Sequence, residues 1–497
     1  MFEMSCYTDF LTLNSAHGSR TEFSVCTERC VKRPGKDKLD ELVKLNSLTF
    51  LALNRSALTM GFRIRTKTLG VLLIAFDLIF KSTAICSAQG VNFGNPAAPP
   101  PPPVFAPVPS PLTSLTGIRK TLNSYGVTIS GIYTTDAFGN VSGGIRTGAT
   151  YQGLLELDLD VDLEKSIGLK GGSFHISGFE IHGTSLSKGY TGDLSTVSNI
   201  DGYDTARFAE YWYEQSMFDD RFSLKIGQFL ADNEFYYSDY SNLFVCGSFG
   251  AFTFLGDNYP FVPTYPLSAL GVRLLLHPMP QLDFKIGLYS GSTLSENTNN
   301  SGLPNIRGRD GIMTFWEVDY KVNHDPNASG LPATYKLGCM FHSRYDGFLN
   351  SNPDSFNRSG YGFYATIDQA IWQKTATDKQ AKAPSLGLFF RIGLMPPAFG
   401  FVSRYVDAGF NYNGLFAGRN EDIFGIGVTH SGISREANRN NQGGLQYTSE
   451  TLIEVTYAAK LTSWLTLQPD FQYIFNPGGT FAAQNATVIG LRSTLTF

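Results

Sequence analysis

The feature that most constrains this 497-residue chain is a series of segments in which apolar and polar side chains alternate strictly. In residues 154–164, LLELDLDVDLE, the aliphatic side chains fall on one face and the carboxylates on the other. The same period of two recurs in residues 451–461, 465–475 and 487–497. This period is the signature of a β-strand whose two faces meet different surroundings. No long helical period follows residue 128, so we predict an all-β fold.

The alternating segments are about 9–12 residues long, which suits a tilted strand crossing a bilayer better than the 5–6 residues usual in soluble sheets. Their polar faces are charged on several successive strands, and no second, wholly apolar set of strands could form a dry sandwich core. We therefore predict a transmembrane antiparallel β-barrel of about sixteen strands. The expected strands are 128–138, 149–163, 172–183, 206–218, 221–231, 269–277, 281–290, 311–321, 333–345, 360–372, 385–394, 402–413, 422–430, 448–461, 464–475 and 486–497.

Long and short connections mostly alternate along this series, as they do in outer-membrane barrels with short periplasmic turns and long outer loops. The longest link covers residues 232–268, and two of the shortest are 219–220 and 462–463. The last strand ends at Phe497 and must pair with the first, so that no strand edge is left unpaired in lipid.

The N-terminal part predicts export. Residues 60–88 hold three basic residues (Arg63, Arg65 and Lys67) before the apolar run VLLIAFDLIF at 71–80, and small residues before a cleavage point after Ala88. These are the three parts of a secretory signal peptide. Because that signal begins at Met60, we interpret residues 1–59 as an N-terminal extension outside the true start, the alternative being an unusually long leader.

A proline-rich linker at residues 89–114 separates the signal peptide from the barrel domain, which we place at 115–497. Its core, NPAAPPPPPVFAPVPSP, predicts an extended polyproline II spacer. One short helix is expected at residues 116–126, with Gly126 as its C-terminal cap.

Aromatic residues gather near the ends of the expected strands, where rings suit the interfacial girdles of a membrane barrel. The girdle candidates are Tyr211, Trp212, Tyr213, Tyr236, Tyr237, Trp316, Trp372 and Trp464. The outward faces otherwise look uniformly apolar and offer no subunit patch.

The charge balance and the motifs exclude several functions. A net charge of −4 without a basic stripe argues against nucleic-acid binding. The chain has no nucleophile elbow, no paired-histidine zinc motif and no Walker loop. We therefore expect no catalytic residues, no metal and no cofactor.

Several stretches resemble the carbohydrate-selective porin (OprB) family of Gram-negative outer membranes. They are residues 126–144, 212–215, 221–229, 264–274 and 450–479, together with the final strand. The resemblance implies a sixteen-stranded barrel that lets sugars such as glucose diffuse across the outer membrane, in contact with its lipid. Trimers are common among porins, so a homotrimer is one expected assembly.

A barrel of this size leaves an aqueous lumen unless a loop folds in, and the link at 232–268 is the natural candidate. Sugars need hydrogen-bonding partners for their hydroxyls and flat aromatic surfaces for their C–H faces. We predict a constriction formed by Glu210, Trp212, Asp232, Glu234 and Arg273.

The carboxylate run at 156–164 leaves two interpretations open. It is either a cation-attracting lane in the lumen or a solvated polar wall whose charge is balanced by neighbours, and we favour the wall.

Three functions remain in view. The first is a passive outer-membrane channel for small neutral sugars. The second is an outer-membrane barrel enzyme such as a lipid hydrolase, because the members of a Ser–His–Asp triad need not be close in sequence. The third is a secreted carbohydrate-binding β protein.

Overall fold

The computed structural model describes residues 116–259, 262–293, 302, 310–325, 328–345, 358–374, 383–440 and 444–497. The predicted N-terminal extension, signal peptide and proline-rich linker lie outside the described residues. Helix α3 spans Thr116–Ser124, close to the expected helix. It stops where Gly126 takes a φ of 77°, a left-handed conformation that glycine adopts without strain.

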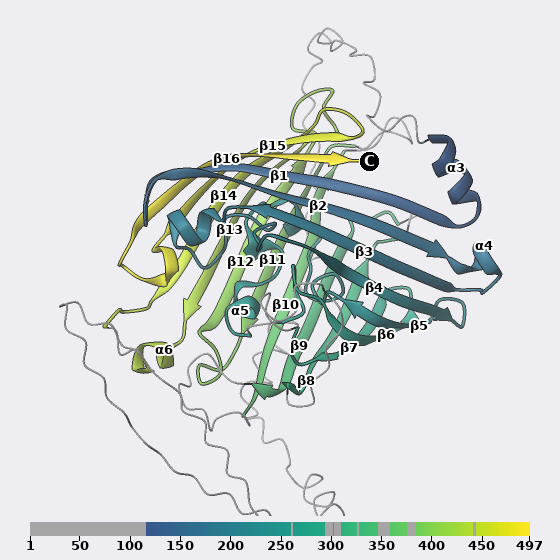
Figure 1. The fold of residues 1–497 in the computed structure, drawn as a ribbon, viewed down its shortest axis with the longest axis horizontal. Helices are drawn as coiled ribbons and strands as arrows, with labels where there is room; N and C mark the ends of the chain where they lie inside the picture. The colour runs from purple at the N-terminus through teal and green to yellow at the C-terminus, as the bar shows by residue number, and fades with distance from the viewer. Residues whose placement is uncertain are drawn as a thin grey trace, which may run out of the picture. The chain divides into compact units, whose positions relative to one another are not determined.

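Sixteen antiparallel strands close into one barrel in sequence order, and Figure 1 shows their wall. Closure joins β1 to β16, where the Gly131 and Phe497 main chains exchange two hydrogen bonds of 2.9 Å. The sixteen strands and the pairing of the last with the first confirm the predicted fold. The strands are β1 (Val127–Gly144), β2 (Gly148–Asp162), β3 (Gly172–Gly183), β4 (Thr205–Met217), β5 (Phe222–Phe229), β6 (Ala269–Met279), β7 (Leu282–Ser290), β8 (Ile312–Val322), β9 (Ala333–Tyr345), β10 (Arg358–Gln373), β11 (Ser385–Leu394), β12 (Val402–Asn413), β13 (Ile423–Ile433), β14 (Ser449–Lys460), β15 (Leu465–Phe475) and β16 (Gln484–Thr496).

The two faces of the wall differ as the alternation predicts. On β11, Leu388 and Phe390 are about two-fifths exposed on the outside, whereas Phe389 and Arg391 are buried on the inside. A closed wall with an apolar outer face is the arrangement that satisfies every strand in lipid. Two stacked sheets with a dry middle are not what the chain forms. Among the described residues, no helix is long and apolar enough to span a bilayer.

The two ends of the barrel carry different connections. Helix α3, the tight β4–β5 turn and the C-terminal Phe497 lie at one end, which is therefore the periplasmic end by its short turns. The longest loops lie at the opposite, outer end. One of them, between β13 and β14, contains α6 (Arg435–Asn440).

The predicted girdle is only partly formed by the residues chosen for it. Trp316 and Trp372 do face outward and are 48% and 41% exposed. Tyr236 and Tyr237 instead lie in a loop that folds into the barrel, and Trp212 points to the lumen, where Lys225 lies 3.8 Å from its ring centre. Aromatic content near a strand end does not reveal which face the ring takes.

Candidate functional site

The loop between β5 and β6, residues 230–268, folds into the barrel, as the sequence predicts for its longest link. It carries the short helix α5 (Thr253–Gly256). Phe235, Phe249, Phe252 and Phe254 of this loop are all fully buried. An apolar loop at the mouth of a water-filled barrel can bury its rings only against the inner wall, so the loop packs there.

The inner wall leaves room for those rings by presenting glycine. A Cβ built on Gly393 of β11 would lie 2.1 Å from the Phe254 ring, and one on Gly387 would lie 2.2 Å from the Tyr240 ring. No larger residue fits at these two positions while the rings keep their places. The glycines therefore help to set the depth at which the loop rests.

Wall carboxylates hold the loop through its main chain. Glu317 accepts a hydrogen bond from the Tyr236 N–H at 2.7 Å. Glu454 accepts two, from the N–H groups of Val245 and Cys246 at 2.6 and 2.9 Å. A buried main-chain N–H group without an acceptor is costly, so these three contacts help to fix the long loop in place.

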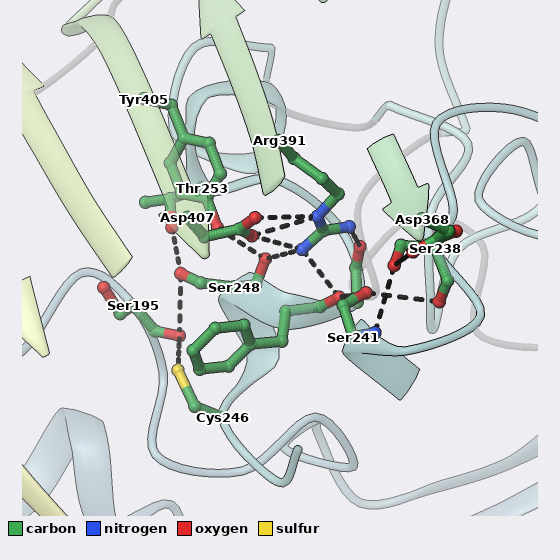
Figure 2. A network of polar contacts seen from close by, with 12 residues as sticks. Ser195, Ser238, Ser241, Cys246, Ser248, Thr253, Asp368, Arg391, Tyr405 and Asp407 are labelled. Atoms are coloured by element: carbon green, nitrogen blue, oxygen red, sulfur yellow. Dashed lines mark hydrogen bonds and ion pairs between the residues drawn. The ribbon is translucent and has the colours of Figure 1, made fainter. Parts of the chain in front are cut away.

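Arg391 of the wall holds the loop through its carbonyl groups, to which it donates hydrogen bonds (Figure 2). The Arg391 guanidinium donates to the carbonyl oxygens of Ser248, Phe249 and Gly250 at 3.1, 2.7 and 3.1 Å. Its charge is balanced by Asp407, which accepts from Arg391 Nε at 3.0 Å. Both side chains are fully buried, so this pair is a structural clamp.

A second loop, between β3 and β4 at residues 184–204, also folds inward, which the sequence analysis missed. Glu450 accepts from the N–H groups of Leu194 and Ser195, both at 2.8 Å. The two loops are joined by main-chain hydrogen bonds, from Asn199 N–H to the Val245 carbonyl at 2.7 Å and from Gly247 N–H to the Thr196 carbonyl at 2.8 Å. Together they form one inner layer that narrows the lumen.

A β-bulge on β4 aims the predicted residues inward. Opposite the short stretch from Ile176 to Gly178 of β3, β4 uses one extra residue between Phe208 and Tyr211. A bulge changes which side chains face each side of a sheet. Beyond it, Trp212 and its alternating neighbours turn to the lumen.

Four charged residues beside Trp212 form one ion-pair cluster. Arg273 donates from Nη2 to Glu214 at 2.7 Å and from Nε to Glu234 at 3.0 Å. Lys225 donates to Glu234 at 2.5 Å and lies over the Trp212 ring. The structure therefore brings together three predicted constriction residues: Trp212, Glu234 and Arg273.

The other two predicted residues lie where the β5–β6 loop leaves its strand. Glu210 accepts from the Leu230 N–H at 2.5 Å. Asp232 accepts from the Tyr265 N–H at 3.1 Å. Burial raises the pKa of the Asp232 carboxyl to about 7, and the negative charge of Glu210 acts in the same direction. These two residues fix the base of the loop.

Comparisons with known proteins agree with this architecture. The family model described as carbohydrate-selective porin, OprB family, matches residues 146–497. The chain belongs to this family. It is an outer-membrane carbohydrate-selective porin, and porins are channels, not enzymes.

The individual relatives share about a quarter or less of their residues with this chain. The porin is 26% identical to Porin B of Pseudomonas aeruginosa over 73% of its own length and 86% of that protein. It is 22% identical to a putative porin, QuiX, of Acinetobacter baylyi, covering 77% and 91% of the two chains. A solved structure of OprB from Pseudomonas putida shares the fold with a TM-score of 0.66 and 24% identity, over 77% of this chain and 96% of that one.

The porin places further residues in the cluster that the sequence analysis did not choose. Lys225 and Glu214 complete the ion pairs, and the His175 ring stacks on Trp212 with ring centres 5.0 Å apart. Strand alternation puts each of these residues on the polar face of its strand, so the period of two could have identified them as facing the lumen. The period of two does not show which residues of different strands lie at the same height in the lumen.

A second charged cluster lies further around the porin wall. Lys285 bridges Glu317 and Asp319, each at 2.7 Å. Lys336 lies 3.2 Å from the Tyr237 ring centre and donates to the Tyr237 carbonyl at 2.9 Å. This cluster also supports the inner loop.

The carboxylate run of 156–164 is not continuous. β2 ends at Asp162, whose side chain caps α4 (Leu163–Ile167) by accepting from Glu164 and Lys165 N–H at 3.1 Å. Only the first part of the run lies on the strand. There His175 contacts Asp160 at 2.7 Å and Asp158 at 4.0 Å.

Proposed function

We propose that small neutral sugars such as glucose pass the lumen of this porin at the Trp212 cluster. The observation that carries the proposal is the arrangement of Trp212, Lys225, Glu234, Glu214 and Arg273 at the base of the inward-folded loop. It combines a partly exposed aromatic side chain with fixed carboxylates in the lumen, and these groups can meet the C–H groups and the hydroxyls of a sugar.

The residues would share the work unequally. Arg273 is only 3% exposed, so its guanidinium serves to hold the carboxylates of Glu214 and Glu234 in place. Those carboxylates, with side chains 21% and 13% exposed, keep oxygen atoms available to sugar hydroxyls. Lys225 lies over the Trp212 ring and His175 stacks on it, so the part of the indole that they leave exposed would meet the C–H groups of a pyranose.

Passage would be driven by the sugar gradient alone. Contacts of this kind must be weak enough to release the solute as readily as they bind it. The solute leaves unchanged, which separates this proposal from a lipid hydrolase.

Single-channel recording of the full porin in a planar bilayer tests the proposal. We expect Trp212→Ala to weaken glucose block of the ion current by about fivefold, since aromatic contacts contribute about 1 kcal/mol. Trp316→Ala is the matched control, because Trp316 faces outward. Glu234→Ala and Arg273→Ala should change both conductance and glucose block.

The placement of the constriction is wrong if Glu234→Ala and Arg273→Ala leave conductance and glucose block unchanged. It is also wrong if Trp212→Ala and Trp316→Ala have equal effects.

We also propose that the porin assembles as a homotrimer within the outer-membrane lipid. The outer face of β1–β3 carries a polar group that departs from the uniformly apolar face expected from the sequence. Tyr133 contacts Tyr151 at 2.8 Å and His182 at 3.3 Å, and His182 contacts Glu180 at 3.0 Å. Charge on a lipid-facing wall is costly, which favours covering this group with a neighbouring subunit.

The mass of the native particle in mild detergent tests the assembly. Three chains per particle are expected, and Glu180→Lys should shift the particle to single chains. A single chain per wild-type particle overturns the trimer.

A further inference from the structure

A pocket of about 450 Å³ is lined by residues of β10–β13 and of the connections at their outer ends. Three of the lining residues are register neighbours: Phe363 pairs with Leu394, and Leu394 pairs with Arg404. Arg404 in turn pairs with Gly432 of β13. Phe363 and Leu394 are 53% and 46% exposed, which places them on the lipid-facing side. The pocket is thus part of the membrane surface of the barrel.

Two arginines stand at this pocket. Arg404 lies across the main chain of Gly432, where a Cβ would come within 3.0 Å of the Arg404 Nε. Arg435, the first residue of α6, also lines the pocket. Proline and methionine from the β11–β12 connection, residues 395–397, close the remaining side.

Neither guanidinium has a carboxylate partner in the described part of the chain. By contrast, Arg439, one turn further along α6, forms an ion pair with Glu436. His430 lies on the same outer face, one register step further into the wall, where it contacts Thr451 at 2.8 Å and adds no negative charge. Within the residues that the structure describes, the pocket therefore carries two positive charges without a carboxylate partner.

The position of the pocket defines what can fill it. The β11–β12 and β13–β14 connections belong to the outer end of the barrel, so the arginines stand at the outer leaflet. Below them the outward side chains of these strands, such as Leu388, Phe390 and Val428, are apolar and exposed. An occupant must place a negative group at the arginines and hydrocarbon along the wall beneath.

We propose that this pocket binds a phosphorylated lipid of the outer leaflet, with the phosphate held by Arg404 and Arg435 and an acyl chain lying on Phe363 and Leu394. Guanidinium groups match phosphate oxygens with paired hydrogen bonds. Basic pockets at a membrane protein's surface are suited to lipid head groups. Free phosphate would satisfy the arginines alone and leave the apolar floor uncovered.

Native mass spectrometry of the full porin in detergent tests the site, with bisphosphorylated lipid A as the probe. Wild type is expected to retain the lipid, and the double variant Arg404→Gln/Arg435→Gln to retain it about thirtyfold less, because each interfacial arginine contributes a factor of about five. Arg439→Gln is the matched control from the same helix and should bind as wild type does. Heat-modifiable migration and unchanged conductance would show that every variant is folded.

Two further probes identify the source of the ligand chemistry. Dephosphorylated lipid A should bind as weakly to wild type as the phosphorylated form binds to the double variant. Inorganic phosphate at millimolar concentration should not displace the lipid. The proposal is overturned if wild type and the double variant retain the phosphorylated lipid equally. It is also overturned if wild type retains dephosphorylated lipid A as well as the phosphorylated form, or if inorganic phosphate displaces the lipid.

Discussion

Glu450 and Glu454 lie four residues apart on the inner face of β14, and each holds a different inward-folded loop. Glu450 accepts the main-chain N–H groups of Leu194 and Ser195 from the β3–β4 loop. Glu454 accepts those of Val245 and Cys246 from the β5–β6 loop. One strand thus fastens both loops, and the width of the lumen depends on this short stretch of wall.

Replacing Glu454 with glutamine should loosen the β5–β6 loop. The two N–H groups face both carboxylate oxygens, and an amide nitrogen in place of one oxygen opposes a donor with a donor. A buried donor left without its acceptor costs about 1–3 kcal/mol. We expect larger and noisier single-channel conductance in planar bilayers.

The control for this experiment is Glu421→Gln. Glu421 pairs with Lys460 at the periplasmic end, and its side chain is 60% exposed. It should behave as wild type does. Equal conductance of wild type, Glu454→Gln and Glu421→Gln would show that Glu454 does not hold the loop.

The barrel itself could be predicted from the sequence because its wall obeys a local rule. Each strand separates lipid from water, so residues such as Leu157 and Asp158 must alternate, and a period of two can be read without knowing the partner strand. The closing pair of Gly131 and Phe497 follows from the need to leave no edge in lipid.

The inner layer could be predicted only in part, since it depends on distant pairs. Glu454 and Val245 are 209 residues apart in sequence, and nothing local in either segment identifies the other. The bulge that turns Trp212 to the lumen is likewise a property of the β3–β4 pairing. The sequence could thus predict which strand faces are polar, but not the height in the barrel at which residues of different strands meet.

Substituting Gly393 with alanine should displace the β5–β6 loop. The new methyl group would lie 2.1 Å from the Phe254 ring, so ring or strand must move. Overpacking of this kind costs about 1–3 kcal/mol. We expect a lower melting temperature, measured by the heat-modifiable shift on gels, and an altered conductance.

A second substitution distinguishes overpacking from a general intolerance of β11. Gly393→Ala combined with Phe254→Leu should recover part of the lost stability, because the smaller side chain makes room. Gly139→Ala is the control, since its Cβ would meet atoms no closer than 3.6 Å. No recovery in the double variant would mean that the ring is not what Gly393 accommodates.

The raised pKa of Asp232 predicts a pH dependence. With a pKa of about 7 in the folded porin and about 4 in the unfolded chain, Asp232 binds more protons when folded between these values. The contribution of Asp232 to the free energy of unfolding is therefore greatest below about pH 4 and is lost as the pH rises through 7. Asp232→Asn keeps an oxygen for the Tyr265 N–H and cannot ionise.

We expect the stability of Asp232→Asn relative to wild type to increase between pH 5 and pH 8 in urea unfolding followed by gel shift. Asp239→Asn, a change in the same loop at an exposed residue, serves as the control. A constant difference between Asp232→Asn and wild type across this pH range would contradict the assignment.

The carboxylates of β2 provide the last prediction, which concerns ion selectivity. Asp158 and Asp160 face the lumen beside His175, whose ring nitrogens contact the carboxylates of both. Fixed charges in water are also screened over about 10 Å at 0.1 M salt. We therefore expect Asp158→Asn/Asp160→Asn to shift the reversal potential in a tenfold KCl gradient by only a few millivolts, against about 59 mV for an ideally selective pore. Glu164→Gln, in α4 beyond the strand, is the control. If the double variant loses most of its preference for cations while Glu164→Gln keeps it, the carboxylates form a cation-attracting path and not merely a solvated wall.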